Sequence, residues 1–105
     1  MKTRLIAAAL GALALTATAL PAAAQVDRRQ DNQAARIDQG VRSGQLTPGE
    51  ARRLDRQQGR IHRTEARMRY RNGGRLTPYQ RAHLDRMQNR ADRHIYRAKH
   101  NGRAY

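Results

Sequence analysis

The sequence predicts an all-α protein in which three helices follow a signal peptide. The first observation is an internal repeat: residues 44–63 and 74–93 match without a gap, and each copy opens with residues that begin a helix. The second is the spacing of apolar side chains by three, four or seven residues, which places them on one helix face. The third is the presence of asparagine and glycine where the helices would end.

Residues 1–24 have the order of a secretory signal peptide. Two basic residues come first, an apolar run of 16 residues from Leu5 to Leu20 follows, and small residues stand at Ala22 and Ala24. The apolar run is shorter than the roughly 18 to 20 residues that span a bilayer. We therefore predict cleavage after Ala24 and a periplasmic or secreted product, residues 25–105, that forms a single basic helical domain.

The composition of this product limits how it can be stable. It has 81 residues, 20 of them Lys or Arg and 8 of them Asp or Glu, and it contains no Cys, Phe or Trp. Small exported proteins often depend on disulfides, so this chain has to rely on helix packing alone. Low hydrophobicity with a high net charge also leaves partial disorder, or folding on a partner, as an open alternative.

The first helix is expected to be the shortest and to run from about Arg28 to Arg42. It would place Ala34, Ile37 and Val41 toward the other helices. We expect it to end near residues 43–44, a serine and a glycine.

The next two helices are predicted from the repeat, whose copies share ten identities in 20 positions. Each copy has a threonine that can cap a helix, a proline at the first helical position, and a glutamate or glutamine three residues after the threonine. This combination is a capping box, and it predicts helices beginning at Pro48 and Pro78. The helix-cap residues are Thr47, Glu50, Thr77 and Gln80.

Apolar spacing and helix stops define the rest of these two helices. The first contains apolar residues seven apart, and the second contains them three and four apart. These residues are Leu54, Ile61 and Met68 in the first helix, and Leu84, Met87, Ala91, Ile95 and Ala98 in the second. The segments 72–74 and 101–102, both asparagine followed by glycine, are expected to end the helices and to leave an antiparallel helical hairpin.

The repeated order G-x-L-T-x-x-E/Q also matches the second half of a calcium-binding EF-hand loop. The positions that should carry calcium ligands hold Gln39, Val41 and Ser43 in one copy, and Arg69, Arg71 and Gly73 in the other. Arginine cannot bind calcium, so we interpret the motif as a helix cap and predict no metal site from it.

The same stretches, residues 46–50 (LTPGE) and 76–80 (LTPYQ), resemble the paired L-T-x-x-Q motifs of the Spy and CpxP family of periplasmic helical chaperones and stress regulators. The chain also resembles small exported proteobacterial proteins of unknown activity that have paired G-x-L-T-x-x-E motifs and an ending similar to residues 95–101. The first resemblance implies a chaperone-like or envelope-stress role in the periplasm. The second implies no activity.

Arginines form two stripes on the predicted hairpin. With 100° per residue, the first stripe covers 100° of arc opposite the apolar positions, and the second covers 60°. The first arginine stripe consists of Arg52, Arg56, Arg60, Arg63, Arg67 and Arg71. The second arginine stripe consists of Arg86, Arg90, Arg93 and Arg97.

Each stripe is either an ordinary solvated helix face or a binding surface for anions. Few carboxylates offset the charge at helical spacing; the pairs Asp38 with Arg42 and Glu65 with Arg69 are examples. The guanidinium group suits bidentate contacts with phosphates and carboxylates, although a GC-rich genome produces the same bias toward arginine. We predict that the ten arginines bind anions and leave the compositional explanation open.

The remaining polar residues give little support for catalysis or metal binding. No two of the histidines, at positions 62, 83, 94 and 100, are four residues apart, so a helical metal pair is not expected; a weak copper or nickel site with Met68 or Met87 is a minor alternative. Ser43 is the only serine and lies outside any nucleophile motif. We predict no enzymatic activity, no catalytic residues and no cofactor. The tyrosines could pack on arginine or lie at a dimer contact.

The functional prediction is therefore a non-enzymatic exported protein that binds anionic partners through arginine-rich helix faces. Candidate partners are lipid headgroups, anionic polysaccharide and acidic or unfolded proteins. Nucleic-acid binding is an alternative that the charge allows but export opposes. A structural or assembly module is a third possibility, in which Leu54, Ile61 and Met68 pair with a second chain to form a homodimer.

Overall fold

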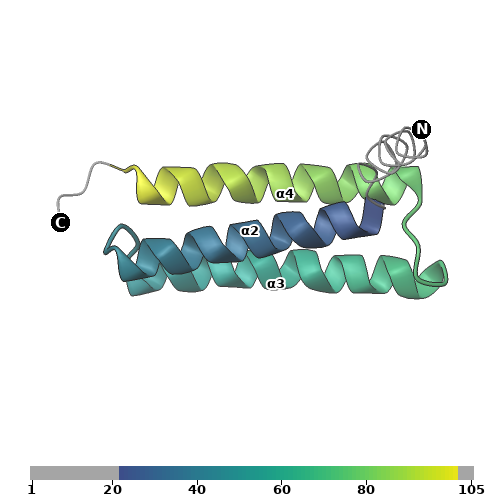
Figure 1. The fold of residues 1–105 in the computed structure, drawn as a ribbon, viewed down its shortest axis with the longest axis horizontal. Coiled ribbons are helices and arrows are strands. Elements are labelled where there is room, and N and C mark those ends of the chain that lie inside the picture. The colour runs from purple at the N-terminus through teal and green to yellow at the C-terminus, as the bar shows by residue number, and fades with distance from the viewer. Residues whose placement is uncertain (1–21, 102–105) are drawn as a thin grey trace, which may run out of the picture.

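The computed structural model describes residues 22–101, and within them three helices form an up-down-up bundle (Figure 1). These helices are α2 (Ala22–Arg42), α3 (Pro48–Arg71) and α4 (Pro78–Lys99). Each helix packs on the other two, with α3 antiparallel to both α2 and α4. The predicted all-α fold with its antiparallel hairpin is confirmed. The predicted signal peptide lies outside the described residues except for its last three, which belong to the first turn of α2.

Both predicted capping boxes are present. In α3 the Thr47 hydroxyl accepts from the backbone N–H of Glu50 at 3.2 Å, and the Glu50 carboxylate accepts from the backbone N–H of Thr47 at 2.9 Å. In α4 the equivalent Thr77 and Gln80 contacts are 3.1 and 3.0 Å. These bonds satisfy backbone donors that have no partner inside the helix, which explains why both helices begin at a proline.

The turn between α3 and α4 is held by one asparagine. Asn72 caps the end of α3, and its side-chain amide donates to the Met68 carbonyl at 3.0 Å and to the Gln80 side chain at 2.6 Å. Gly73 and Gly74 follow with positive φ angles of 63° and 91°, which glycine adopts without strain. The end of one helix is therefore linked directly to the cap of the next. Helix α4 ends at Lys99, close to the predicted stop.

Two apolar clusters fill the interior, one toward each end of the bundle. The cluster near the α2–α3 turn contains Ile37, Leu46, Ala51, Leu54 and Ile95. The other contains Val26, Ile61, Leu84 and Ala91, with Met68, Leu76 and Met87 partly buried against it. The residues predicted to face the core of the hairpin are therefore buried or partly buried.

The prediction for α2 was wrong in its start and in two of the three residues of its inward face, whereas Ile37 is buried as predicted. The helix begins at Ala22, not at Arg28, and Ala34 and Val41 are exposed. Its buried residues include Val26, which the prediction left out, and Ile37. The expected face was offset because it was assigned from apolar residues alone.

The actual inward face of α2 includes a glutamine and a glycine. Gln33 is fully buried, and Gly40 lies directly under Leu46. A Cβ atom at Gly40 would lie 2.7 Å from the Leu46 side chain, so the close approach requires glycine. Neither residue type counts as apolar in a periodicity analysis, which explains the error.

Candidate anion-binding surface

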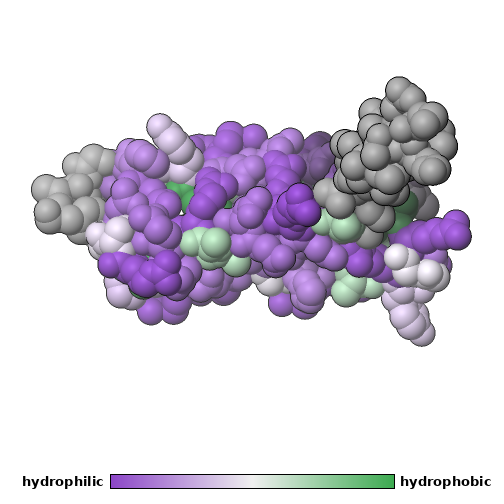
Figure 2. All heavy atoms as spheres, viewed as in Figure 1, coloured by the Kyte–Doolittle hydropathy of each residue, from purple (hydrophilic) through white to green (hydrophobic). Residues whose placement is uncertain are grey.

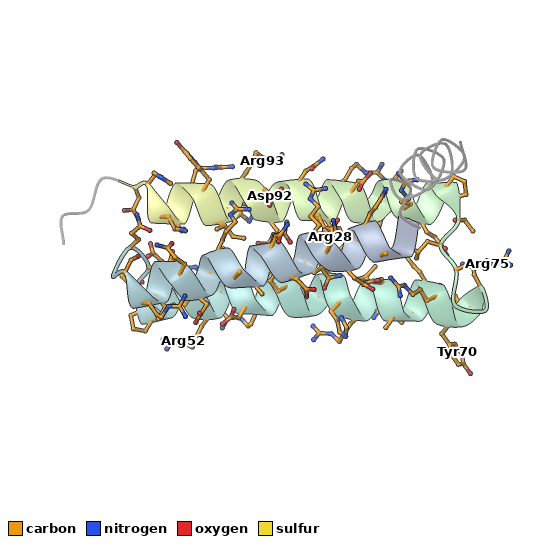
Figure 3. The ribbon with its side chains drawn as sticks, viewed as in Figure 1. Arg28, Arg52, Tyr70, Arg75, Asp92 and Arg93 are labelled. Carbon is orange, nitrogen blue, oxygen red and sulfur yellow. The ribbon has the colours of Figure 1, made fainter. Side chains whose placement is uncertain are left out.

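All ten arginines of the two stripes are exposed, as the helix geometry predicted. None of them lies within 4.0 Å of a carboxylate in the part of the chain that the structure describes. Arg52 and Arg93 point away from the bundle in Figure 3. The face seen in Figure 2 is mostly hydrophilic, with only small apolar areas. The stripes thus present positive charge that the described residues do not neutralise.

The arginines that do form ion pairs lie mainly where α2 meets its neighbours. Arg29 and Arg36 of α2 both donate to the carboxylate of Asp92 in α4, at 2.8 and 2.9 Å. Arg29 also lies 3.7 Å from Asp85. Burial alone would raise the pKa of Asp92, but the hydrogen bonds from Arg29, Gln33 and Arg36 outweigh it and hold this pKa below its ordinary value. We call the contact of α2 with a neighbouring helix a seam. In the seam between α2 and α4, these arginines and aspartates therefore have partners of opposite charge.

The seam between α2 and α3 contains a buried carboxylate. Glu65 is only 3% exposed, pairs with Arg69 and accepts from the Gln30 side chain at 2.6 Å. Arg69 also reaches Asp27 at 3.1 Å. Burial and the neighbouring Asp27 carboxylate raise the pKa of Glu65, although Arg69 and Gln30 act against the rise. Both helical pairs predicted from sequence, this one and Asp38 with Arg42, are present.

A layer of three glutamines, one from each helix, lies in the interior of the bundle, where Gln33 contacts both Gln58 and Gln88. Gln33 of α2 donates to the Gln88 carbonyl at 2.9 Å and to Asp92 at 2.8 Å, and it accepts from Gln58 at 3.0 Å. Gln88 donates to the Val26 carbonyl at 3.1 Å. Sequence reasoning missed this layer. The available signal was that residues 58 and 88 are equivalent glutamines in the repeat.

One arginine of each stripe borders the same groove between α3 and α4. Arg60 lines it from α3 with Arg53 and the carboxylate of Glu50, and Arg97 lines it from α4 with His94, in a shallow space of about 380 Å³. Leu54 and Ala98 form an apolar part of its lining. The stripes were predicted separately, so their shared groove and the contribution of Arg53 are new. Arg53 lies seven residues before Arg60, a spacing that could have revealed it.

His94 lies beside this groove, and its pKa is affected by the positive charge around it. Its ring nitrogen Nδ1 lies 3.2 Å from the side-chain oxygen of Gln57 across the groove. Burial lowers the pKa of His94, and the positive charges of Arg97, Arg90 and Arg93 lower it further. The second stripe therefore creates a local potential that disfavours another positive charge.

Most of the described tyrosines and histidines lie at the surface of the bundle. Tyr70, Tyr79 and Tyr96 are exposed, and Tyr96 also stacks on the ring of His100, with 4.1 Å between ring centroids. Tyr105 lies outside the described residues. Across residues 22–101 no group of three or more histidine or acidic side chains could hold a metal ion.

Comparison of the chain with known families, with characterised proteins and with solved structures finds no significant match. None of the described helices is long and apolar enough to span a membrane.

Proposed function

We propose that this protein is a non-enzymatic exported helical protein that binds anionic partners through its two arginine stripes. The observation that carries the proposal is the set of ten exposed arginines without a carboxylate partner among residues 22–101. A fold that needed these side chains for stability would pair or bury them, as it does with Arg29 and Arg69.

The charge distribution along the chain supports the proposal. Helix α2 has four arginines against three carboxylates, α3 has eight against three, and α4 has six basic residues against two. The excess is therefore concentrated on the hairpin, where one arginine of each stripe borders the same groove. Such a local excess attracts anions over a distance of about one Debye length, and each arginine near an anionic surface contributes about 1 kcal/mol.

Export is part of the proposal because residues 1–24 have the order of a signal peptide. A chaperone-like or envelope-stress role is its most specific version, and it depends on the resemblance of the two capping segments to L-T-x-x-Q motifs. Cell fractionation with N-terminal sequencing tests the export. A mature chain in the periplasm or medium that begins at Gln25 is expected, and an uncleaved cytoplasmic chain would contradict it.

The binding proposal is tested with protein that is expressed from the full sequence and purified after any processing by the cell. The probes are neutral vesicles, anionic vesicles, heparin and polyglutamate, each at low and at physiological ionic strength. We expect binding to one or more anionic probes that weakens steeply with salt, and no binding to neutral vesicles. Salt-insensitive binding, or no binding to any anionic probe, would contradict the proposal.

Two variants show whether the first stripe carries the binding. Replacing Arg52, Arg56, Arg60 and Arg63 by glutamine removes four charges and should weaken binding several hundredfold, at about 1 kcal/mol each. Replacing the same four residues by lysine keeps the charge and should retain most of the affinity, less the bidentate contacts. Equal affinity of the glutamine variant and the unmodified protein would mean that the stripe is only a solvated face.

A further inference from the structure

The end of the bundle where α3 turns into α4 presents two exposed tyrosines among arginines. Tyr70 is 90% exposed and Tyr79 is 78% exposed. Three arginines surround them in the sequence and are also exposed, and Tyr70 and Arg75 extend away from the bundle in Figure 3. We call this surface the tyrosine tip; it consists of Tyr70, Arg71, Arg75, Tyr79 and Arg81.

Hydrogen bonds link the two helix ends that carry the tip. The Asn72 amide joins the Met68 carbonyl to the Gln80 side chain, which ties the end of α3 to the beginning of α4. A Cβ atom on Gly73 or Gly74 would have no neighbour within 4 Å. The two tyrosines therefore lie on linked helix ends with open space around the turn.

The charge at the tip is also uncompensated. Within the described part of the chain, Arg71, Arg75 and Arg81 have no carboxylate within ion-pair distance. Two carboxylates of this half of the bundle have other partners: Asp27 pairs with Arg69, and Asp85 pairs with Arg29. The tip thus combines aromatic rings that can leave water with cations that can bind phosphate.

This combination matches the interface of an anionic bilayer. Tyrosine has an apolar ring and a polar hydroxyl, so it favours the headgroup level of a membrane, where both parts are satisfied. Arginine forms bidentate hydrogen bonds with lipid phosphates. We propose that the protein docks end-on, through the tyrosine tip, onto a membrane that contains anionic phospholipid. The inference goes beyond the proposed function: it adds a second contact surface, which shares only Arg71 with the stripes, together with its partner and an orientation.

Tyr96, in the other half of the described bundle, provides a control. It is 58% exposed and lies between Arg93 and Arg97, but its ring stacks on that of His100. Two carboxylates also lie in this half of the bundle: Asp38, which pairs with Arg42 near the α2–α3 turn, and Glu50, which belongs to the cap of α3. Substitution of Tyr96 therefore changes a tyrosine of the same protein outside the tip.

The test is sedimentation with vesicles made of phosphatidylcholine and phosphatidylglycerol in a ratio of about two to one, beside vesicles of phosphatidylcholine alone. The double variant Tyr70→Ala with Tyr79→Ala should bind the anionic vesicles about tenfold more weakly than the unmodified protein, because two aromatic contacts are lost. The control Tyr96→Ala should bind without change. Circular dichroism of each variant confirms that the helices are retained.

A fluorescence measurement locates the contact directly, because the chain contains no tryptophan. The variant Tyr79→Trp should show a blue shift of its emission when anionic vesicles are added, since the indole ring leaves water. The variant Tyr96→Trp should show none. A shift at residue 96 without one at residue 79 would place the contact at the wrong end and overturn the proposal.

The outcomes separate this inference from the proposed function. If the double tyrosine variant binds anionic vesicles as well as the unmodified protein, end-on docking is wrong while anion binding by the stripes stands. If the unmodified protein binds heparin or polyglutamate but not anionic vesicles, the lipid surface is excluded and a different anion is the partner. If no anionic probe binds, both proposals fail.

Discussion

The seams that α2 forms and the outer faces of α3 and α4 use the same residue in opposite ways. At the seams, Arg29, Arg36 and Arg69 each reach a carboxylate on a neighbouring helix or turn and are partly shielded from water. On the outer faces, ten arginines extend into solvent with no such partner among residues 22–101. The role of an arginine therefore depends on whether its helix face borders a seam or faces solvent.

The difference has an energetic consequence. A seam arginine forms charged hydrogen bonds that fix the position of α2, and each such bond contributes about 1.5 to 3 kcal/mol before solvent screening. A stripe arginine contributes its helix propensity and adds repulsion among like charges, which lowers stability. The stripes therefore cost the isolated bundle stability that only a bound anion would return.

The largest effect on stability is expected at the centre of the seams. The substitution Gln33→Ala removes the hydrogen bonds to Gln58, Gln88 and Asp92 and leaves a void at a fully buried site. We expect the free energy of unfolding to fall by about 3 kcal/mol, measured by urea denaturation.

The exposed neighbour Asn32→Ala is the control for Gln33→Ala, since it removes an amide from the same helix at a solvated position. It should change the free energy of unfolding by less than about 0.5 kcal/mol. Equal effects of the two substitutions would show that the glutamine layer does not hold the helices together.

The next largest effect on stability is expected at Asp92, whose carboxylate accepts hydrogen bonds from Arg29 and Arg36. The substitution Asp92→Ala should lower the free energy of unfolding by about 2 kcal/mol, because Arg29, Arg36 and Gln33 lose an acceptor that is only partly exposed. Asp55→Ala removes an exposed aspartate from α3 and should cost less than about 0.5 kcal/mol. Similar losses from both would contradict the distinction between seam and outer face.

The pH dependence of Asp92 has a defined sign. Its pKa in the folded protein lies below the ordinary value of 3.8, so its contribution is fully present above that pH. The contribution is lost as the pH falls further, through the folded pKa. The acid-induced loss of stability should therefore be smaller in Asp92→Ala than in the unmodified protein.

A smaller effect should appear at His94 beside the second stripe. Its folded pKa lies below the ordinary value of 6.5, so the unfolded chain binds this proton more tightly. Stability should fall as the pH decreases from 6.5 through the folded pKa, and His94→Gln should remove that part of the dependence. Thermal unfolding of both proteins across this pH range measures the difference; identical profiles would mean that neither burial nor the stripe arginines lower the pKa of His94.

Local signals in the sequence were sufficient to predict much of this fold. The caps at Thr47 and Thr77 and the stop at Asn72 depend on residues close in sequence, so the helix boundaries of the hairpin were confirmed. The outward direction of the stripes also follows from the helix period alone. These features require no knowledge of which helix packs on which.

Features that depend on two or more helices were not predictable in the same way. Gln33 is buried because Gln58 and Gln88 meet it from other helices, and Gly40 is buried because Leu46 folds back over it. Neither would be chosen as a core residue from its own helix. For the same reason the sequence showed two stripes but not the groove that they share.

The most direct test of this account compares two double variants that each remove two positive charges. The stripe variant is Arg56→Gln with Arg60→Gln, and the seam variant is Arg29→Gln with Arg36→Gln; both are measured by urea denaturation and by binding to the anionic probe that the unmodified protein prefers. The stripe variant should keep or slightly raise its free energy of unfolding, because like-charge repulsion is reduced, and should lose more than about tenfold in affinity. The seam variant should lose about 2 kcal/mol of stability and keep its affinity while folded. Equal losses of affinity in the two variants would show that only net charge matters and would contradict the division between structural and binding arginines.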